Sequence, residues 1–147
     1  MIKPITALLL VTLVSACANQ PPSNLGIQNG ALAPCPSTPN CVSSMESKNN
    51  SAHIPPLQPR GTETLANLWE DLIQTINSKE QAKIIKQNSE YLHAEFSSRF
   101  FGFVDDVEFY RNEPIIQVRS ASRVGYSDLG VNRNRVEAIR KELQQLP

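Results

Sequence analysis

The sequence predicts one α+β domain: a helix, then a four-stranded antiparallel meander, then a C-terminal helix packed on one face of the sheet. Two stretches, 62–78 and 130–146, repeat apolar residues at helical spacing. Short runs between them alternate apolar and polar residues, as half-buried strands do. A chain of 147 residues leaves room for one core. We expect a signal peptide over 1–16, a lipidated flexible tether and disulfide-stapled arm over 17–56, and the globular domain over 57–147.

The amino end reads MIKPITALLLVTLVSAC, with Lys3, an apolar run from Ile5 to Val14, and small residues before Cys17. This pattern predicts a secretory signal, because the run has about half of the roughly 20 residues that a membrane-spanning helix needs. "VSAC" also resembles the bacterial lipobox, in which the cysteine after the cleavage site receives diacylglycerol. We therefore expect Cys17 to anchor the protein in the cell envelope. In lipoproteins with this motif, Asp after the cysteine is the usual signal for retention in the inner membrane. The resemblance therefore implies that Ala18 favours the outer membrane, facing the periplasm, if the organism has two membranes. A plain secretory signal is the alternative.

The other two cysteines, Cys35 and Cys41, bracket CPSTPNC, whose prolines and asparagine favour a turn. In an exported protein this even number of remaining cysteines predicts a disulfide between them. A metal site is less favoured because two thiolates supply half of the ligands of zinc, and a redox pair because the two-residue spacing is missing. The Pro-, Ser- and Asn-rich stretch from Ala18 to about Pro59 cannot form a core, and we expect its part before Cys35 to be a flexible tether.

The first helix has Thr62 as its predicted N-cap. Its apolar stripe consists of Leu65, Leu68, Trp69, Leu72 and Ile76. Next, AKIIKQNSEYLHAEF predicts a hairpin that turns at Asn88 and Ser89. For VDDVEFY and IIQVRSA, a register with Tyr110 opposite Ile115 keeps apolar residues on one face and polar residues on the other.

The last helix has Asn132 as its predicted N-cap and an apolar stripe of Val136, Ile139, Leu143 and Leu146. Four stretches together resemble the DUF1499 family, a domain of unknown function: LAPCPSTPNCVSS, YLHAEF, FGFVDDVEF and IIQVRSASRVGYSDLGVNRNRVEAIR. The resemblance covers about Leu32 to Leu143. It implies a lipoprotein-like or exported small domain of unassigned activity, and it provides no catalytic residues.

Three groups of residues are candidates for function. The polar face of the sheet carries His93, Glu95, Asp106, Glu108, Gln117 and Arg119, which suit acid–base chemistry or a metal, although alternation alone produces a solvated face of this kind. The stretch SRVGYSDLGVNRNR carries Arg123, Tyr126, Asp128, Arg133 and Arg135, and its arginines near a helix start would suit a phosphate or carboxylate. The alternative is a turn in which Asp128 bonds nearby backbone and the arginines are solvated or pair with acidic residues. In SSRFFGF, three phenylalanines are expected in the core, with a recognition loop as the alternative.

The balance of 14 basic and 14 acidic residues argues against nucleic acid as a partner. Serine has no nucleophile-elbow sequence around it, and phosphate-binding loops and repeats are missing. We therefore expect a membrane-tethered binding or interaction domain whose partner is an anionic small molecule, an envelope polymer or an envelope protein. We expect no cofactor and no metal. The alternative is a small envelope hydrolase or isomerase that uses His93 with Glu95 or Asp106.

Overall fold

The computed structural model describes residues 20–146. The chain forms two helices and five strands in the order β1, α1, β2, β3, β4, β5, α2. Their bounds are Cys41–Ser43 (β1), Leu65–Asn77 (α1), Ala82–Gln87 (β2), Tyr91–Ser97 (β3), Val104–Asn112 (β4), Ile115–Ser122 (β5) and Val131–Leu143 (α2).

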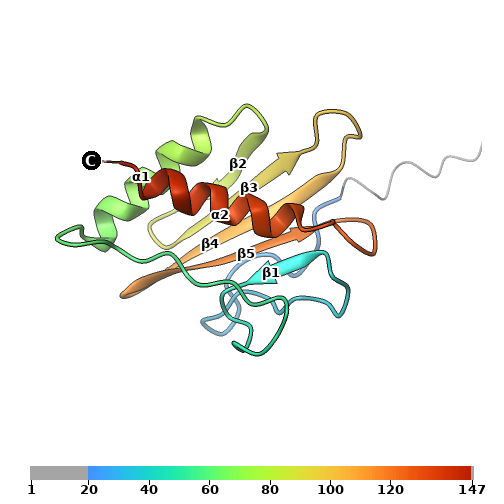
Figure 1. The fold of residues 1–147 in the computed structure, drawn as a ribbon, viewed down its shortest axis with the longest axis horizontal. Coiled ribbons are helices and arrows are strands. Elements are labelled where there is room, and N and C mark those ends of the chain that lie inside the picture. The colour runs from blue at the N-terminus through green and yellow to red at the C-terminus, as the bar shows by residue number, and fades with distance from the viewer. Residues whose placement is uncertain (1–19, 147) are drawn as a thin grey trace, which may run out of the picture.

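The strands form one antiparallel sheet in the order β1-β5-β4-β3-β2, and α2 runs across one face of it (Figure 1). The predicted α+β class, the meander β2 to β5 and the covering C-terminal helix are confirmed. The prediction missed β1, which pairs with β5 at Cys41–Ala121 and Ser43–Arg119. This strand has three residues and follows a proline-rich stretch, so the sequence holds no alternation long enough to reveal it.

The core lies between the sheet and the two helices. Every residue of the predicted α1 stripe is buried, and so are Val136, Ile139 and Leu143 of α2, whereas Leu146 lies beyond the end of that helix. The predicted N-cap of α1 is wrong by two positions: Thr64, not Thr62, caps the helix, and its hydroxyl accepts a hydrogen bond from the Asn67 N–H at 3.1 Å. Both threonines have suitable side chains, so propensity alone did not decide between them.

The register of β4 and β5 differs from the predicted one by two residues. Phe109 lies opposite Val118 and Asn112 opposite Ile115, so the hairpin closes with a two-residue turn at Glu113 and Pro114. A shift of two residues keeps each side chain on its predicted face, because side chains alternate with a period of two. The apolar pattern therefore predicted correctly which face each side chain occupies, but it could not predict the length of the turn.

The face of the sheet opposite the helices is called the polar face here. It is partly covered by the N-terminal segment, residues 20–40, which lies behind the sheet in Figure 1. Its Gly26 N–H donates to Glu108 of β4 at 2.7 Å, and its Leu32 is buried. The stretch expected to be a tether thus contacts the domain through residues such as Gly26 and Leu32. Ile54 and Leu57 are also part of the core, so tertiary packing begins before the expected boundary at residue 57.

The Cys35–Cys41 disulfide is present, with an S–S distance of 2.04 Å. It joins the N-terminal segment to the first residue of β1. The predicted signal peptide and Cys17 lie outside the described residues. Within residues 20–146, neither helix has the length and apolarity needed to cross a membrane.

Candidate functional site

A cluster of charged side chains lies on the polar face and is centred on Asp106 of β4. The Asp106 carboxylate contacts Nε2 of His93 at 2.7 Å, and it accepts two hydrogen bonds from the Arg123 guanidinium at 2.7 and 2.8 Å. Arg123 also pairs with Glu95. Asp106 is 1% exposed and His93 5%. The interpretation of the polar face as an ordinary solvated surface is therefore wrong for His93 and Asp106, which are buried. The N-terminal segment partly covers this face.

A second carboxylate, Glu108, is completely buried beside this cluster. It accepts hydrogen bonds from the Tyr91 hydroxyl and the Gly26 N–H, both at 2.7 Å, and from Nη1 of Arg119 at 3.1 Å. Arg119 itself is 4% exposed, yet its Nε has no hydrogen-bond partner among residues 20–146. A buried N–H group without a partner is unfavourable by about 1–3 kcal/mol. The Nε–H group of Arg119 is therefore the donor of the cluster that lacks an acceptor within residues 20–146.

The pKa values of the cluster follow from its contacts. Burial alone would raise the pKa of Asp106, but hydrogen bonds from Arg123 and His93 outweigh burial and hold this pKa below its usual value of 3.8. The hydrogen bond to Asp106 raises the pKa of Arg123 further above its ordinary range. Burial and the charge of Glu108 raise the pKa of Tyr91, so its hydroxyl stays protonated and serves as a donor. The ion pair between Asp106 and Arg123 is thus maintained at neutral pH.

A pocket of about 310 Å³ lies between the N-terminal segment and the polar face, and it is called the polar-face pocket. Its lining consists of Pro22, Asn24, Pro34, Cys35, Pro36, Asp106, Arg119, Ala121, Ser122 and Arg123. Arg119 thus combines an unpartnered donor with a position in a pocket wall. His93 and Glu95 do not belong to this lining.

The turn between β5 and α2 is organised by Asp128. Its carboxylate accepts from the backbone N–H groups of Gly130 at 2.9 Å and Asn132 at 2.8 Å, and these bonds hold its pKa below its usual value despite partial burial. The predicted N-cap Asn132 is wrong, because Gly130 occupies the cap position with a left-handed backbone, φ +83°. Asn132 lies inside the helix and is completely buried, where its amide binds the Asn40 carbonyl at 3.1 Å.

The arginines at the start of α2 have partners within the protein. Arg133 donates to the backbone carbonyls of Ser51 at 2.6 Å and His53 at 2.9 Å. Arg135 pairs with Asp105 on the helix-covered face of the sheet. Tyr126, by contrast, is exposed. Of the predicted site residues, the structure therefore brings together His93, Asp106, Arg119 and Arg123 and places the residues of the turn and helix elsewhere.

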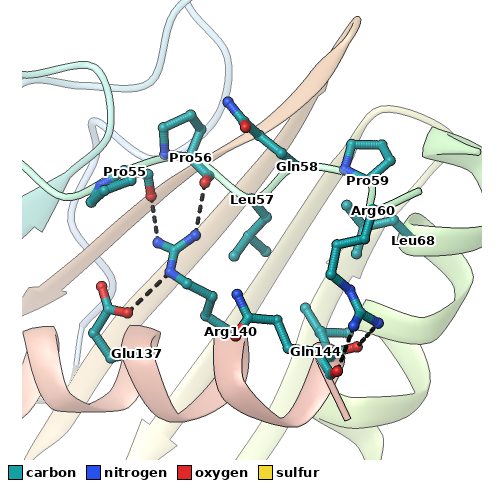
Figure 2. Close-up of a pocket in the computed structure, with 11 residues that line it drawn as sticks. Pro55, Pro56, Leu57, Gln58, Pro59, Arg60, Leu68, Glu137, Arg140 and Gln144 are labelled. Carbon is teal, nitrogen blue, oxygen red and sulfur yellow. Dashed lines mark hydrogen bonds and ion pairs between the residues drawn. The ribbon is translucent and has the colours of Figure 1, made fainter. Parts of the chain in front are cut away.

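A larger pocket of about 400 Å³ lies between the 55–60 segment and α2 (Figure 2). Figure 2 shows that its two arginines point at backbone carbonyls: Arg140 donates to Pro55 and Pro56, and Arg60 donates to Gln144. Arg60 thereby satisfies carbonyls at the C-terminal end of α2, where a cation is also favoured by the helix dipole. These contacts connect the segment to the helix, and the pocket offers no spare charged group.

Two residues of the site escaped sequence reasoning. Gly26 acts through its backbone N–H, and Tyr91 was identified as part of a strand without a role. Alternation does place Tyr91 on the polar face, so this signal was available in the sequence. Across residues 20–146, no group of three or more His, Cys, Asp or Glu side chains is arranged to hold a metal ion.

Fold and site define a small α+β domain whose antiparallel sheet has helices on one face and a buried ion-pair cluster on the other. The model of one protein family, described as a protein of unknown function (DUF1499), matches residues 31–143. The chain belongs to this family. A search of curated proteins found no match to the chain.

Proposed function

We propose that the chain is an envelope protein tethered by lipid on Cys17, and that its domain binds a ligand in the polar-face pocket. The sequence supports the tether through its short apolar run, the small residues and the cysteine. The observation that carries the binding function is the buried Nε of Arg119, which lacks a partner and belongs to a pocket-lining residue. A ligand atom that accepts this hydrogen bond would complete the cluster.

The charge balance of the cluster favours a neutral acceptor over an anion. Three carboxylates, on Glu95, Asp106 and Glu108, face two guanidinium groups, on Arg119 and Arg123. A protonated His93 brings the sum to zero and a neutral His93 leaves it negative, so neither state leaves a positive charge for an anion to neutralise. The ligand therefore offers a hydroxyl or carbonyl oxygen, as the glycan of an envelope polymer does.

The test compares binding of soluble cell-wall glycan fragments by the wild-type protein and by Arg119→Lys, using titration calorimetry. Lysine keeps the charge opposite Glu108 but has no equivalent of Nε, so we expect affinity to fall at least about tenfold, the equivalent of one lost hydrogen bond. Arg111→Lys, which alters a surface pair with Glu113, is the matched control and should bind as the wild type does. Equal binding by Arg119→Lys and the wild type, or no binding by either, contradicts the proposal.

The tether is tested separately by fractionation of cells that express the wild type or Cys17→Ser. The wild type should partition with membranes, and the variant should not. Equal membrane fractions for both proteins would refute the lipid anchor.

A small hydrolase or isomerase is the second candidate, and the 2.7 Å contact between His93 and Asp106 favours it. In such an enzyme the carboxylate would orient the imidazole as a general base. Binding remains the better-supported function because His93 does not line the pocket and Asp106 is also held by Arg123. His93→Gln tests the alternative: an enzyme would lose its cellular phenotype with this variant, and a binding domain would keep it.

A further inference from the structure

Two loops at one end of the sheet expose most of the large apolar side chains on the surface of residues 20–146. Nine large apolar side chains are exposed within residues 20–146, and six of these nine lie in or directly beside the β3–β4 and β5–α2 loops. They are Phe100, Phe101, Phe103, Tyr126, Leu129 and Val131. The prediction that the phenylalanines belong to the core is wrong: Phe100 is 88% exposed, Phe101 77% and Phe103 55%. Monomeric soluble domains rarely concentrate apolar side chains in this way without a partner.

The two loops are neighbours because their strands end side by side. The Arg123 N–H, at the start of the β5–α2 loop, donates to the carbonyl of Val104, at the end of the β3–β4 loop, at 3.1 Å. Phe101 and Phe103 stack on one another with ring centroids 5.8 Å apart and do not fold back onto the core. The six residues are called the apolar tip.

The N-terminal segment leads to the same end of the sheet. Gly26 lies at Glu108, in the middle of β4, whereas Pro22 and Asn24 line the polar-face pocket together with Ser122 and Arg123, at the end of β5. In Figure 1 the described chain begins at the end of the sheet that carries both loops. Gln20 is three residues after Cys17, and three extended residues span at most about 10 Å. A lipid on Cys17 would therefore hold this end of the domain close to the membrane.

We infer that the apolar tip inserts into the lipid surface, so that the domain stands on the membrane with β3, β4 and β5 ending at the bilayer. The inference rests on the proposed tether at Cys17. Apolar and aromatic side chains partition about 5–10 Å into the boundary between headgroups and acyl chains. Charge contributes little here, because Arg99 pairs with Glu80 at 3.2 Å and Asp128 is engaged by Gly130 and Asn132. Insertion should therefore be the same on zwitterionic and anionic lipid, and insensitive to salt.

The quantity to measure is the depth of the loops in the lipid, not the affinity of the protein for membranes. Two or more acyl chains anchor a protein stably and would mask any contribution of the loops to membrane affinity. The protein is purified from membranes and its mass is recorded for lipid on Cys17. It is then reconstituted into phosphatidylcholine vesicles with a nitroxide label on Phe101→Cys or Leu129→Cys. The matched control is a label on Glu113→Cys, in the β4–β5 turn at the opposite end of the sheet. Collision rates with oxygen and with a water-soluble nickel complex report the depth of each label.

We expect labels at 101 and 129 to lose at least about tenfold in nickel collisions relative to the label at 113, in 0.05 M and in 0.5 M salt. Nickel access at 101 equal to that at 113 overturns the inference even if the mass shows the lipid. A dipolar contact between labels at 101 of two copies also overturns it, because the tip would then be a dimer interface.

A mass without lipid refutes the tether alone, and the same protein then tests the tip by flotation with the vesicles. If the wild-type protein floats with the vesicles and the double variant Phe100→Ser, Phe101→Ser does not, the result supports insertion. If the wild-type protein does not float, the inference is overturned.

Discussion

Replacing Asp106 by Asn is the sharpest test of the buried cluster. The change keeps the shape of the side chain and removes its charge, so that Arg123, whose side chain is 4% exposed, keeps Glu95 as a carboxylate partner within residues 20–146. Removal of one partner from a buried ion pair lowers the free energy of unfolding by about 3–5 kcal/mol. Because Asn retains one acceptor oxygen, we expect the lower end, about 3 kcal/mol, and a fall in Tm of about 10 °C.

The assay is urea unfolding followed by the fluorescence of Trp69, the single tryptophan of the chain, which is buried in the core. Glu113→Gln is the control: its carboxylate pairs with Arg111 at the surface, so its loss should cost less than about 0.5 kcal/mol. A variant Asp106→Asn that unfolds within about 1 kcal/mol of the wild type at pH 7 would refute the account of the cluster.

The same variant predicts a pH dependence with a definite sign. The pKa of Asp106 is lower in the folded protein than its usual 3.8, so the stabilisation is fully present above that value. It is lost as the pH falls through the lower, folded pKa, because the proton then removes the charge that the variant lacks. The stability gap between wild type and Asp106→Asn should therefore begin to shrink as the pH falls below about 4 and should close as the pH falls through the folded pKa of Asp106. A stability gap that persists unchanged at acidic pH would show that the variant is destabilised by the altered shape of the side chain and not by the loss of its charge.

Three further outcomes follow from named contacts. Intact mass after alkylation without reductant should show Cys35 and Cys41 protected, and reduction should lower the free energy of unfolding by about 2 kcal/mol because the closed loop is short. Asp128→Ala should cost about 1–2 kcal/mol in thermal unfolding because two backbone N–H groups at the start of α2 lose their acceptor, and no loss would contradict its capping role. Arg135→Ala should destabilise more than Arg133→Ala, since it leaves the buried Asp105 unpaired while Arg133 contacts neutral carbonyls, and the reverse order would refute this reasoning.

The parts of the fold that depend on local pattern could be predicted from the sequence. Apolar residues at helical spacing identified α1 and α2, and alternation identified β2 to β5 and the two faces of the sheet. Features that depend on distant contacts could not be predicted. Three-residue β1 forms because β5 offers it an edge, and the β4–β5 register is set by a two-residue turn that RNEP does not specify.

The candidate site shows the same division between local and distant information. Alternation placed His93, Asp106 and Arg119 on one face, and all three belong to the cluster. Alternation cannot tell whether a face is bare or covered, however, and the covering segment is rich in Pro, Ser and Asn, the composition of a tether. Its contact with the sheet depends on single groups such as the Gly26 N–H, which carry no signal in the sequence.

The cluster and the N-terminal segment depend on each other. Glu108 is completely buried and accepts hydrogen bonds from three donors, one of which is the Gly26 N–H. Removing this donor would leave a buried carboxylate with an unfilled acceptor, which is unfavourable, so the ion pairs favour a segment that stays on the polar face. The same segment closes the polar-face pocket, and its first described residues lie at the end of the sheet that carries the apolar tip. A ligand in the polar-face pocket and a membrane at the apolar tip would therefore act on the same N-terminal segment. A change in the position of this segment would affect both ligand binding and membrane contact.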